Sequence, residues 1–262
     1  MTHFDLDKLL SGHVFRFLFI FCRIGSAMML LPGFAESYVP QRARLMLAFA
    51  ISLLLVGPML PMIPAPPADV AGLARMLGYE ILIGLYFGSI VRLIMSALET
   101  IGSIIAIQTG LSNAVILNPA LATQSPLPSA FLSVVGLTLV FTTGLDHYLL
   151  RSVIATYDLF PPGGAFEPGD MAQVFARTYN HSFLIGIELS SPFLVIGLLM
   201  YVAVGLMQRL MPQVQLFLVM LPVQIWGGLF LLAITVSGIM TLWLQYFDQS
   251  IAGIFAARGT GL

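Results

Sequence analysis

Charged residues and cysteine are both scarce in this sequence. Only 9% of its 262 residues are charged, and Cys22 is its single cysteine, so an internal disulfide and a cysteine-based metal cluster are excluded. Soluble globular domains carry about 25% charged residues. With 58% hydrophobic residues and a mean hydropathy of +0.96, the composition indicates an all-α polytopic membrane protein. The net charge of −1 argues against nucleic-acid binding by bulk electrostatics.

Motifs for catalysis are also missing. The sequence contains no His-Glu-x-x-His, no Gly-x-Ser-x-Gly and no phosphate-binding glycine loop. We therefore expect neither an enzyme nor a bound cofactor. The first residues, Met1–Asp7, are acidic where a signal peptide is basic, so the apolar run that follows is expected to be a retained helix.

Long apolar runs separated by proline and glycine predict the membrane spans. A spanning helix needs about 20 mostly apolar residues. The longest polar stretch, 156–181, is expected to be an aqueous loop. No segment is large and polar enough to form a soluble domain, so the function is expected to lie in the helices and their junctions. The expected spans are 14–31, 45–63, 76–98, 129–150, 183–207 and 214–246, with 101–117 as an interrupted extra segment.

One junction, residues 209–225, combines helix-breaking and amide residues between two apolar runs. Hydrocarbon cannot satisfy amide side chains, and each proline removes a backbone donor. Such a segment is stable at membrane depth only when protein surrounds it or when it lines a wet path. We therefore expect an assembled conduit or gate, with the prolines and glutamines Pro212, Gln213, Gln215, Pro222 and Gln224 in subunit contacts.

Several charged residues lie inside or at the edges of apolar runs: Arg23, Glu80, Arg92, Glu99 and Glu188. One interpretation is a proton or ion relay. The other is that these groups pair with neighbouring helices and hold an assembly in register. We favour the second, because a relay usually shows several carboxylates in one span and here the acids are dispersed.

Gly84 and Gly88 have the Gly-x-x-x-Gly spacing that allows two helices to approach closely. Apolar helices contain this spacing often by chance. It indicates helix packing and does not identify the partner.

Residues 108–119 form a second unusual region, because they are uncharged and yet poor in helix-forming residues. Gly110, Ser112, Asn113 and Asn118 all weaken a helix, and Pro119 is followed by further prolines. A neutral, broken segment suits a constriction that occludes a pore. A re-entrant turn that merely connects two helices remains the alternative.

With these residues identified, the chain resembles the FliR family, the R component of the flagellar type III protein export gate. Virulence secretion systems contain a homologous subunit. The resemblance rests on four stretches that follow one another in the family's order and span nearly the whole chain. These are 23–34 with 39–44, then 80–88, then 102–119 with 124–125, and 209–225.

The resemblance implies a non-enzymatic subunit of a right-handed helical, multi-subunit gate through which unfolded flagellar proteins are exported. Its expected partners are the P and Q subunits (FliP and FliQ), the FlhB switch protein, rod components, the exported chains and membrane lipid. The implied location is the bacterial inner membrane, in the flagellar basal body. Residues 1–181 correspond to a P-like part and 182–262 to a Q-like helical hairpin.

The family's pore-closing plug corresponds to residues 106–122. The candidate plug residues are Gln108, Gly110, Leu111, Ser112, Asn113, Val115, Ile116, Asn118 and Pro119. The candidate subunit-interface residues are Arg23, Glu80, Gly84, Gly88, Pro212, Gln213, Gln215, Phe217, Pro222 and Gln224.

A self-contained small-molecule transporter is the competing function, because dispersed intramembrane charges and broken helices occur there too. A transporter should show an internal repeat and a compact polar cluster near mid-membrane. Inspection of the sequence finds neither.

Overall fold

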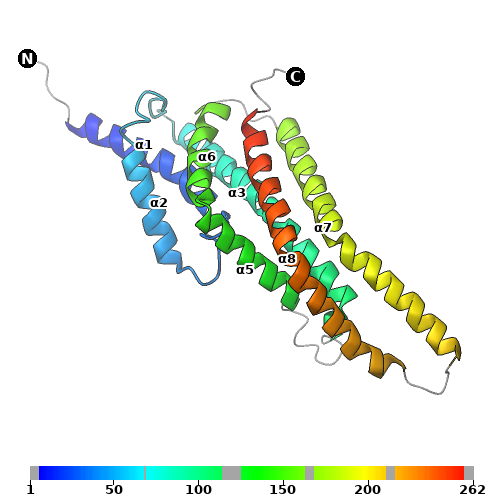
Figure 1. The fold of residues 1–262 in the computed structure, drawn as a ribbon. Helices are drawn as coiled ribbons and strands as arrows, with labels where there is room; N and C mark the ends of the chain where they lie inside the picture. The colour runs from blue at the N-terminus through cyan, green and yellow to red at the C-terminus, as the bar shows by residue number, and fades with distance from the viewer. Residues whose placement is uncertain (1–5, 68, 114–124, 163–167, 211–215, 257–262) are drawn as a thin grey trace, which may run out of the picture. The chain divides into compact units, whose positions relative to one another are not determined.

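The computed structural model describes residues 6–67, 69–113, 125–162, 168–210 and 216–256. Every regular element within these ranges is helical, so the all-α fold class is confirmed. In chain order (Figure 1) the elements are α1 (Leu6–Met28), α2 (Gln41–Leu55), α3 (Val70–Gln108), the 3-10 turn η1 (Leu111–Asn113), α5 (Leu127–Thr142), α6 (Leu145–Leu159), α7 (Pro168–Leu210) and α8 (Leu216–Ala256).

Three of the described helices, α3, α7 and α8, are long and apolar enough to cross a membrane. The pair α5 and α6 is bent by 77° and would count as a fourth, broken span. This is fewer than the six spans that the sequence predicted. The helix α2 has 15 residues, which rise only about 22 Å, short of a bilayer core of about 30 Å.

Two of the expected segments, 76–98 and 101–117, are joined by one continuous helix, α3, which has 39 residues and ends at Gln108. The interruption expected within 101–117 falls after Gln108, where Gly110 has φ of 72°, and Gly102 lies inside the helix. A Cβ atom on Gly102 would lie under 3.0 Å from the backbone of Ser129 in α5. This glycine therefore marks a close contact between two helices.

The polar stretch 156–181 is not the single loop that its composition predicted. The helix α6 runs to Leu159, and α7 begins already at Pro168. Proline is favourable in the first turn of a helix, where its missing N–H has no intrahelical partner. Asp170 in the same turn interacts favourably with the positive end of the helix dipole.

The expected span 129–150 is bent because Gly144 adopts a left-handed conformation, with φ of 76°. Residues with a side chain rarely take this conformation, so glycine is the residue that permits the turn. The helix α5 ends at Thr142, and α6 starts directly after Gly144.

The chain divides into two compact units, each assembled from separated segments. Unit 1 contains residues 1–93, 144–176 and 251–262, and unit 2 contains residues 94–143 and 177–250. These units reflect packing within the chain. They do not test the expected division into a P-like part, 1–181, and a Q-like part, 182–262, which stays a prediction.

Unit 1 is built on α1, α2, α6 and the first part of α3. Its core contains apolar side chains with no exposure to solvent, among them Phe19, Ile20, Ile83 and Ile90. The exposed helix α2 contacts α1, where the ring of Phe49 packs edge-on against Phe17 with centroids 4.8 Å apart.

Unit 2 surrounds the second part of α3 with α5, α7 and α8. Trp243 of α8 is fully buried and its indole N–H donates to the carbonyl of Ile94 at 3.5 Å. Gly136 of α5 lies against Leu98 and the same indole ring. In this unit, α3 is therefore the central helix.

Candidate functional site

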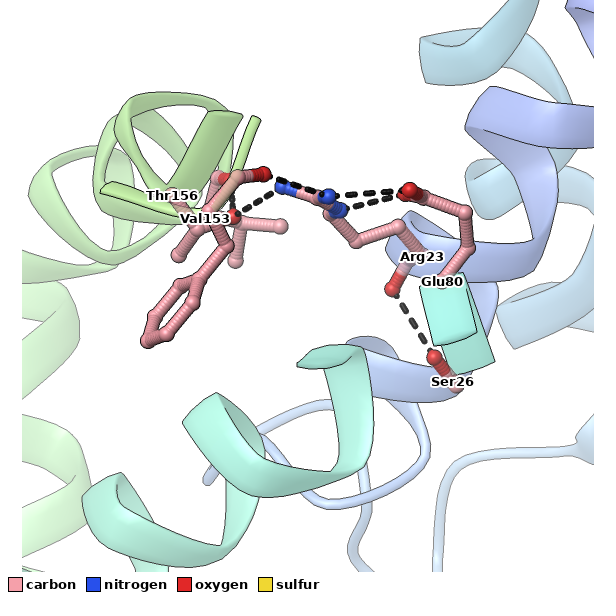
Figure 2. A network of polar contacts seen from close by, with 6 residues as sticks. Arg23, Ser26, Glu80, Val153 and Thr156 are labelled. Atoms are coloured by element: carbon pink, nitrogen blue, oxygen red, sulfur yellow. Dashed lines mark hydrogen bonds and ion pairs between the residues drawn. The ribbon is translucent and has the colours of Figure 1, made fainter. Parts of the chain in front are cut away.

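The candidate interface residue Arg23 lies at the centre of a buried polar cluster in unit 1, shown in Figure 2. Its Nε donates to Glu80 Oε2 at 2.5 Å, and its Nη2 donates to Glu80 Oε1 at 3.0 Å. Both side chains are 0% exposed. Two parallel charge-assisted hydrogen bonds fix the orientation of both groups, so α1 and α3 are held in one register here.

The remaining donors of Arg23 reach α6. Its Nη2 also donates to the carbonyl oxygen of Phe160 at 2.9 Å, and its Nη1 donates to Thr156 Oγ1 at 3.3 Å. The guanidinium carbon lies 3.8 Å from the ring centroid of Tyr157, a cation–π distance. One arginine thus joins three helices, α1, α3 and α6.

Arg23 and Glu80 hold α1, α3 and α6 together, and this structural brace depends on both charges. Burying an ion pair gains little net stability over an apolar pair, but removing one partner leaves an uncompensated buried charge. The glutamate and the hydrogen bonds to α6 satisfy most donors of the guanidinium. Among the described contacts of Arg23, Glu80 is the only acidic group, which suits a structural brace better than a chain of proton carriers.

The two glycines of the Gly-x-x-x-Gly spacing lie on α3 against α1 within unit 1. A Cβ atom on Gly84 would lie under 3.0 Å from Ser26 Oγ and from the carbonyl oxygen of Arg23. A Cβ atom on Gly88 would lie 2.8 Å from Leu30 Cβ and 2.9 Å from the carbonyl oxygen of Ala27. The close helix approach that this spacing indicates is therefore formed inside the chain.

Arg23, Glu80, Gly84 and Gly88 are all buried by residues of their own chain. The structure gives them a role in shaping unit 1. Direct contact of these four residues with another subunit stays a prediction.

The first residues of the candidate plug are packed inside unit 2. Gln108 ends α3, and a Cβ atom on Gly197 of α7 would lie under 3.0 Å from its amide oxygen and Cδ. Thr109 is 2% exposed, and Gly228 of α8 provides the space for its methyl group. The plug segment therefore starts from a fixed base between α7 and α8.

The chain changes direction directly after this base. Gly110 has φ of 72°, and η1 follows with Leu111 and Ser112 half-buried. Gln108 Oε1 is buried without a hydrogen-bond partner in the described part of the chain. The other candidate plug residues, Val115, Ile116, Asn118 and Pro119, lie outside the described residues, as does the side chain of Asn113.

The remaining candidate interface residues belong to the junction between α7 and α8. Pro212, Gln213 and Gln215 lie outside the described residues, and of Phe217 only its place in the first turn of α8 is described. Pro222 lies inside α8 and is exposed, and Gln224 is half-buried. These observations do not show what the junction contacts, so its contact with other subunits stays a prediction.

The sequence did not single out several residues that the structure places at these sites. Thr156, Tyr157 and Phe160 bind Arg23, and Gly197 and Gly228 hold the base of the plug. For the two glycines a signal existed, since each is a helix-weakening residue inside a long apolar helix. Among the described residues, no group of three or more His, Cys, Asp or Glu side chains is placed to hold a metal ion.

Comparison with known proteins finds one family model, described as "Bacterial export proteins, family 1", that matches residues 14–250. The flagellar biosynthetic protein FliR of Caulobacter vibrioides is 36% identical over 230 residues, covering 88% of this chain and 92% of that protein. FliR of Escherichia coli is 30% identical, with 86% and 84% covered. The Yop proteins translocation protein T of Yersinia pestis is 27% identical over 163 residues, covering 62% of each chain.

Proposed function

The chain belongs to family 1 of the bacterial export proteins, and from this membership we propose that it is a subunit of the flagellar type III protein export gate. In this role it helps to form and close the pore through which unfolded flagellar proteins leave the cell. It acts without catalysis of its own. The observation that carries the proposal is the extent of the match, which includes 14–250 and leaves little of the chain for a different function.

The family membership also decides between the two functions that the sequence left open. The small-molecule transporter is overturned, because the relatives are named as flagellar biosynthetic and translocation proteins. The structural features that suggested a transporter, dispersed charges and helix breaks, belong here to an export component.

Large apolar surfaces on α7 and α8 support assembly with other subunits. Of the residues in the most apolar part of α3, 50% are buried within the chain. The corresponding share is only 17% for α7 and 17% for α8. The proposed partners for these surfaces are the P and Q subunits, arranged with this chain in a right-handed helical assembly. We propose that the P or Q helices form hydrogen bonds with Gln213, Gln215 and Gln224.

The pore is proposed to be closed at rest by residues 108–119. Gln108 and Thr109, held by Gly197 and Gly228, support this proposal because they give the segment a fixed base. Beyond that base, the poor helix propensity of the segment keeps the cost of rearrangement small. The energy for transport is proposed to come from other parts of the export apparatus.

The proposed location is the inner membrane, within the flagellar basal body. There the FlhB switch protein is proposed to associate with the gate, and rod components are proposed to stack on its exit side. The apolar helices α3, α7 and α8 support a membrane location.

An in-frame deletion in the native bacterium tests the function. We expect the deletion strain to secrete no hook or filament protein and to recover secretion when the gene is supplied on a plasmid. Normal secretion in the deletion strain would contradict the proposal. Uptake of small solutes should be the same in both strains.

A further inference from the structure

Glu188 is an isolated charge on an otherwise uncharged stretch of α7. Between Arg177 and Arg209 no other acidic or basic residue occurs in the sequence, with histidine counted as neutral. Its side chain is exposed, and it forms no ion pair within the described part of the chain. An ionisable residue in a spanning segment normally faces the interior of its bundle, so an outward position needs an explanation.

The packed face of α7 shows where Glu188 points. Gly186 lies against Thr100 of α3, and Gly197 lies against Gln108 of the same helix. At about 100° per residue, Glu188 is about 200° away from Gly186 around the helix. It therefore projects from the side opposite to the packed face. The buried residues of that face are Ser182, Gly186, Ser190, Phe193 and Gly197.

The outward face around Glu188 is mostly apolar, with Ser191 as an exposed polar neighbour three residues further along the helix. Leu184, Val195, Leu199 and Val202 recur with Glu188 at helical spacing, and all four side chains are exposed. A water-filled passage is lined by polar groups, whereas this face carries branched aliphatic side chains. Neither water nor lipid suits a face that combines such side chains with one carboxylate. An apolar protein helix with a matching polar group suits it.

Pro192 adds a second acceptor at the same place. The backbone N–H of residue 192 would normally donate to the carbonyl oxygen of Glu188, four residues earlier, but proline has no N–H. The carboxylate and this carbonyl are both acceptors, and both belong to Glu188. The complementary group is a side chain with several donors and a positive charge, which means arginine or lysine.

We propose that the outward face of α7 is a docking surface for an apolar helix of another export-gate subunit, which places an arginine or lysine against Glu188. This inference rests on the proposed function and specifies which face and which charge the assembly uses. The apolar side chains supply the contact area. The ion pair fixes the register of the two helices, since a charge in an apolar contact is stable only opposite its partner.

Co-purification with co-expressed P and Q subunits tests the role of the charge. We expect Glu188→Gln to reduce the amount of P or Q subunit bound to this chain by roughly tenfold, because one charge would remain unpaired in the contact. The matched control is Asp170→Asn, which removes an exposed carboxylate from the first turn of the same helix and should leave binding unchanged.

The outcomes separate this inference from the proposed function. If the natural chain does not bind P or Q, the proposed function fails. If it binds them and Glu188→Gln binds equally well, the docking inference fails while the proposed function stands.

A photo-crosslinking amino acid at Val195 tests the location of the surface. We expect a product whose mass equals this chain plus one P or Q subunit. A product with lipid only, or with a second copy of this chain, would overturn the inference. Leu199 lies on the same face and serves as a second position if the Val195 variant does not fold.

Discussion

The guanidinium of Arg23 on α1 binds both carboxylate oxygens of Glu80 on α3, although the two residues are separated by 57 positions in the sequence. Both side chains are fully buried, and the same guanidinium reaches Thr156 and Phe160 near the end of α6. The pair is thus the point at which unit 1 joins three of its helices. The pair fixes the positions of these helices relative to one another, and each charge offsets the desolvation cost of burying the other.

Removing one member of this pair should destabilise unit 1 strongly. We expect Glu80→Gln or Arg23→Met to cost about 3–5 kcal/mol, because the remaining polar group stays buried without its partner. The measurement is the thermal unfolding temperature of the purified chain in detergent. The double variant Arg23→Met with Glu80→Leu should be less damaged than either single variant. If the single variants unfold at the same temperature as the natural chain, the pair does not stabilise the fold.

The contact between α1 and α3 at Gly84 should not tolerate a methyl group. Gly84→Ala places a Cβ against Ser26 Oγ and the carbonyl of Arg23, and we expect a loss of about 1–3 kcal/mol from overpacking. Gly78 lies on the same helix with nothing within 4 Å of a Cβ. Gly78→Ala is therefore the control and should be neutral or slightly stabilising, since alanine favours a helix by about 1 kcal/mol. Equal effects at both positions would contradict the structure.

Removing the plug segment should open the pore. Deletion of residues 110–116 leaves Gln108 and Thr109 in place and removes the residues that are proposed to occlude the path. We expect a higher ion leak through membranes that contain the assembled complex, measured as conductance in planar bilayers. If the conductance equals that of the natural complex, residues 110–116 do not form the plug.

The base of the plug can be loosened without a deletion. Gly228→Ala places a Cβ under 3.0 Å from both Cγ2 and Cβ of Thr109, and rotation of the side chain cannot move that Cβ away. We expect an increased ion leak in the assembled complex. The neighbouring Gly227 has nothing within 4 Å of a Cβ, so Gly227→Ala should conduct as the natural chain does. A leak in the Gly227 variant alone would contradict the proposed base.

The composition predicted a polytopic membrane protein, and apolar runs of about 20 residues, too long for single spanning strands, indicated the all-α fold class. It could not predict which apolar segments fuse into one helix. Glycine on its own weakens a helix, but the contact of Gly102 with Ser129 makes it a packing position inside α3. The start of α7 was missed for a related reason, since a polar amphipathic turn resembles a loop until its proline is recognised as a helix start.

The site was partly predictable. Arg23 and Glu80 stood out because charge is expensive in an apolar run, and the spacing of Gly84 and Gly88 indicated close packing. The partners of Arg23 on α6 could not be found, because Thr156 lies 133 positions away and nothing in the local sequence marks it. The position of Gln108 against Gly197 likewise depends on how three helices come together in unit 2.

The central claim is that other subunits cover the apolar faces and polar junctions of this chain. A native mass spectrum of the chain co-expressed with the P and Q subunits tests it most directly. We predict one dominant complex that contains all three proteins, with little free chain. A spectrum dominated by a stable monomer of this chain, beside a separate complex of P and Q, would contradict the account.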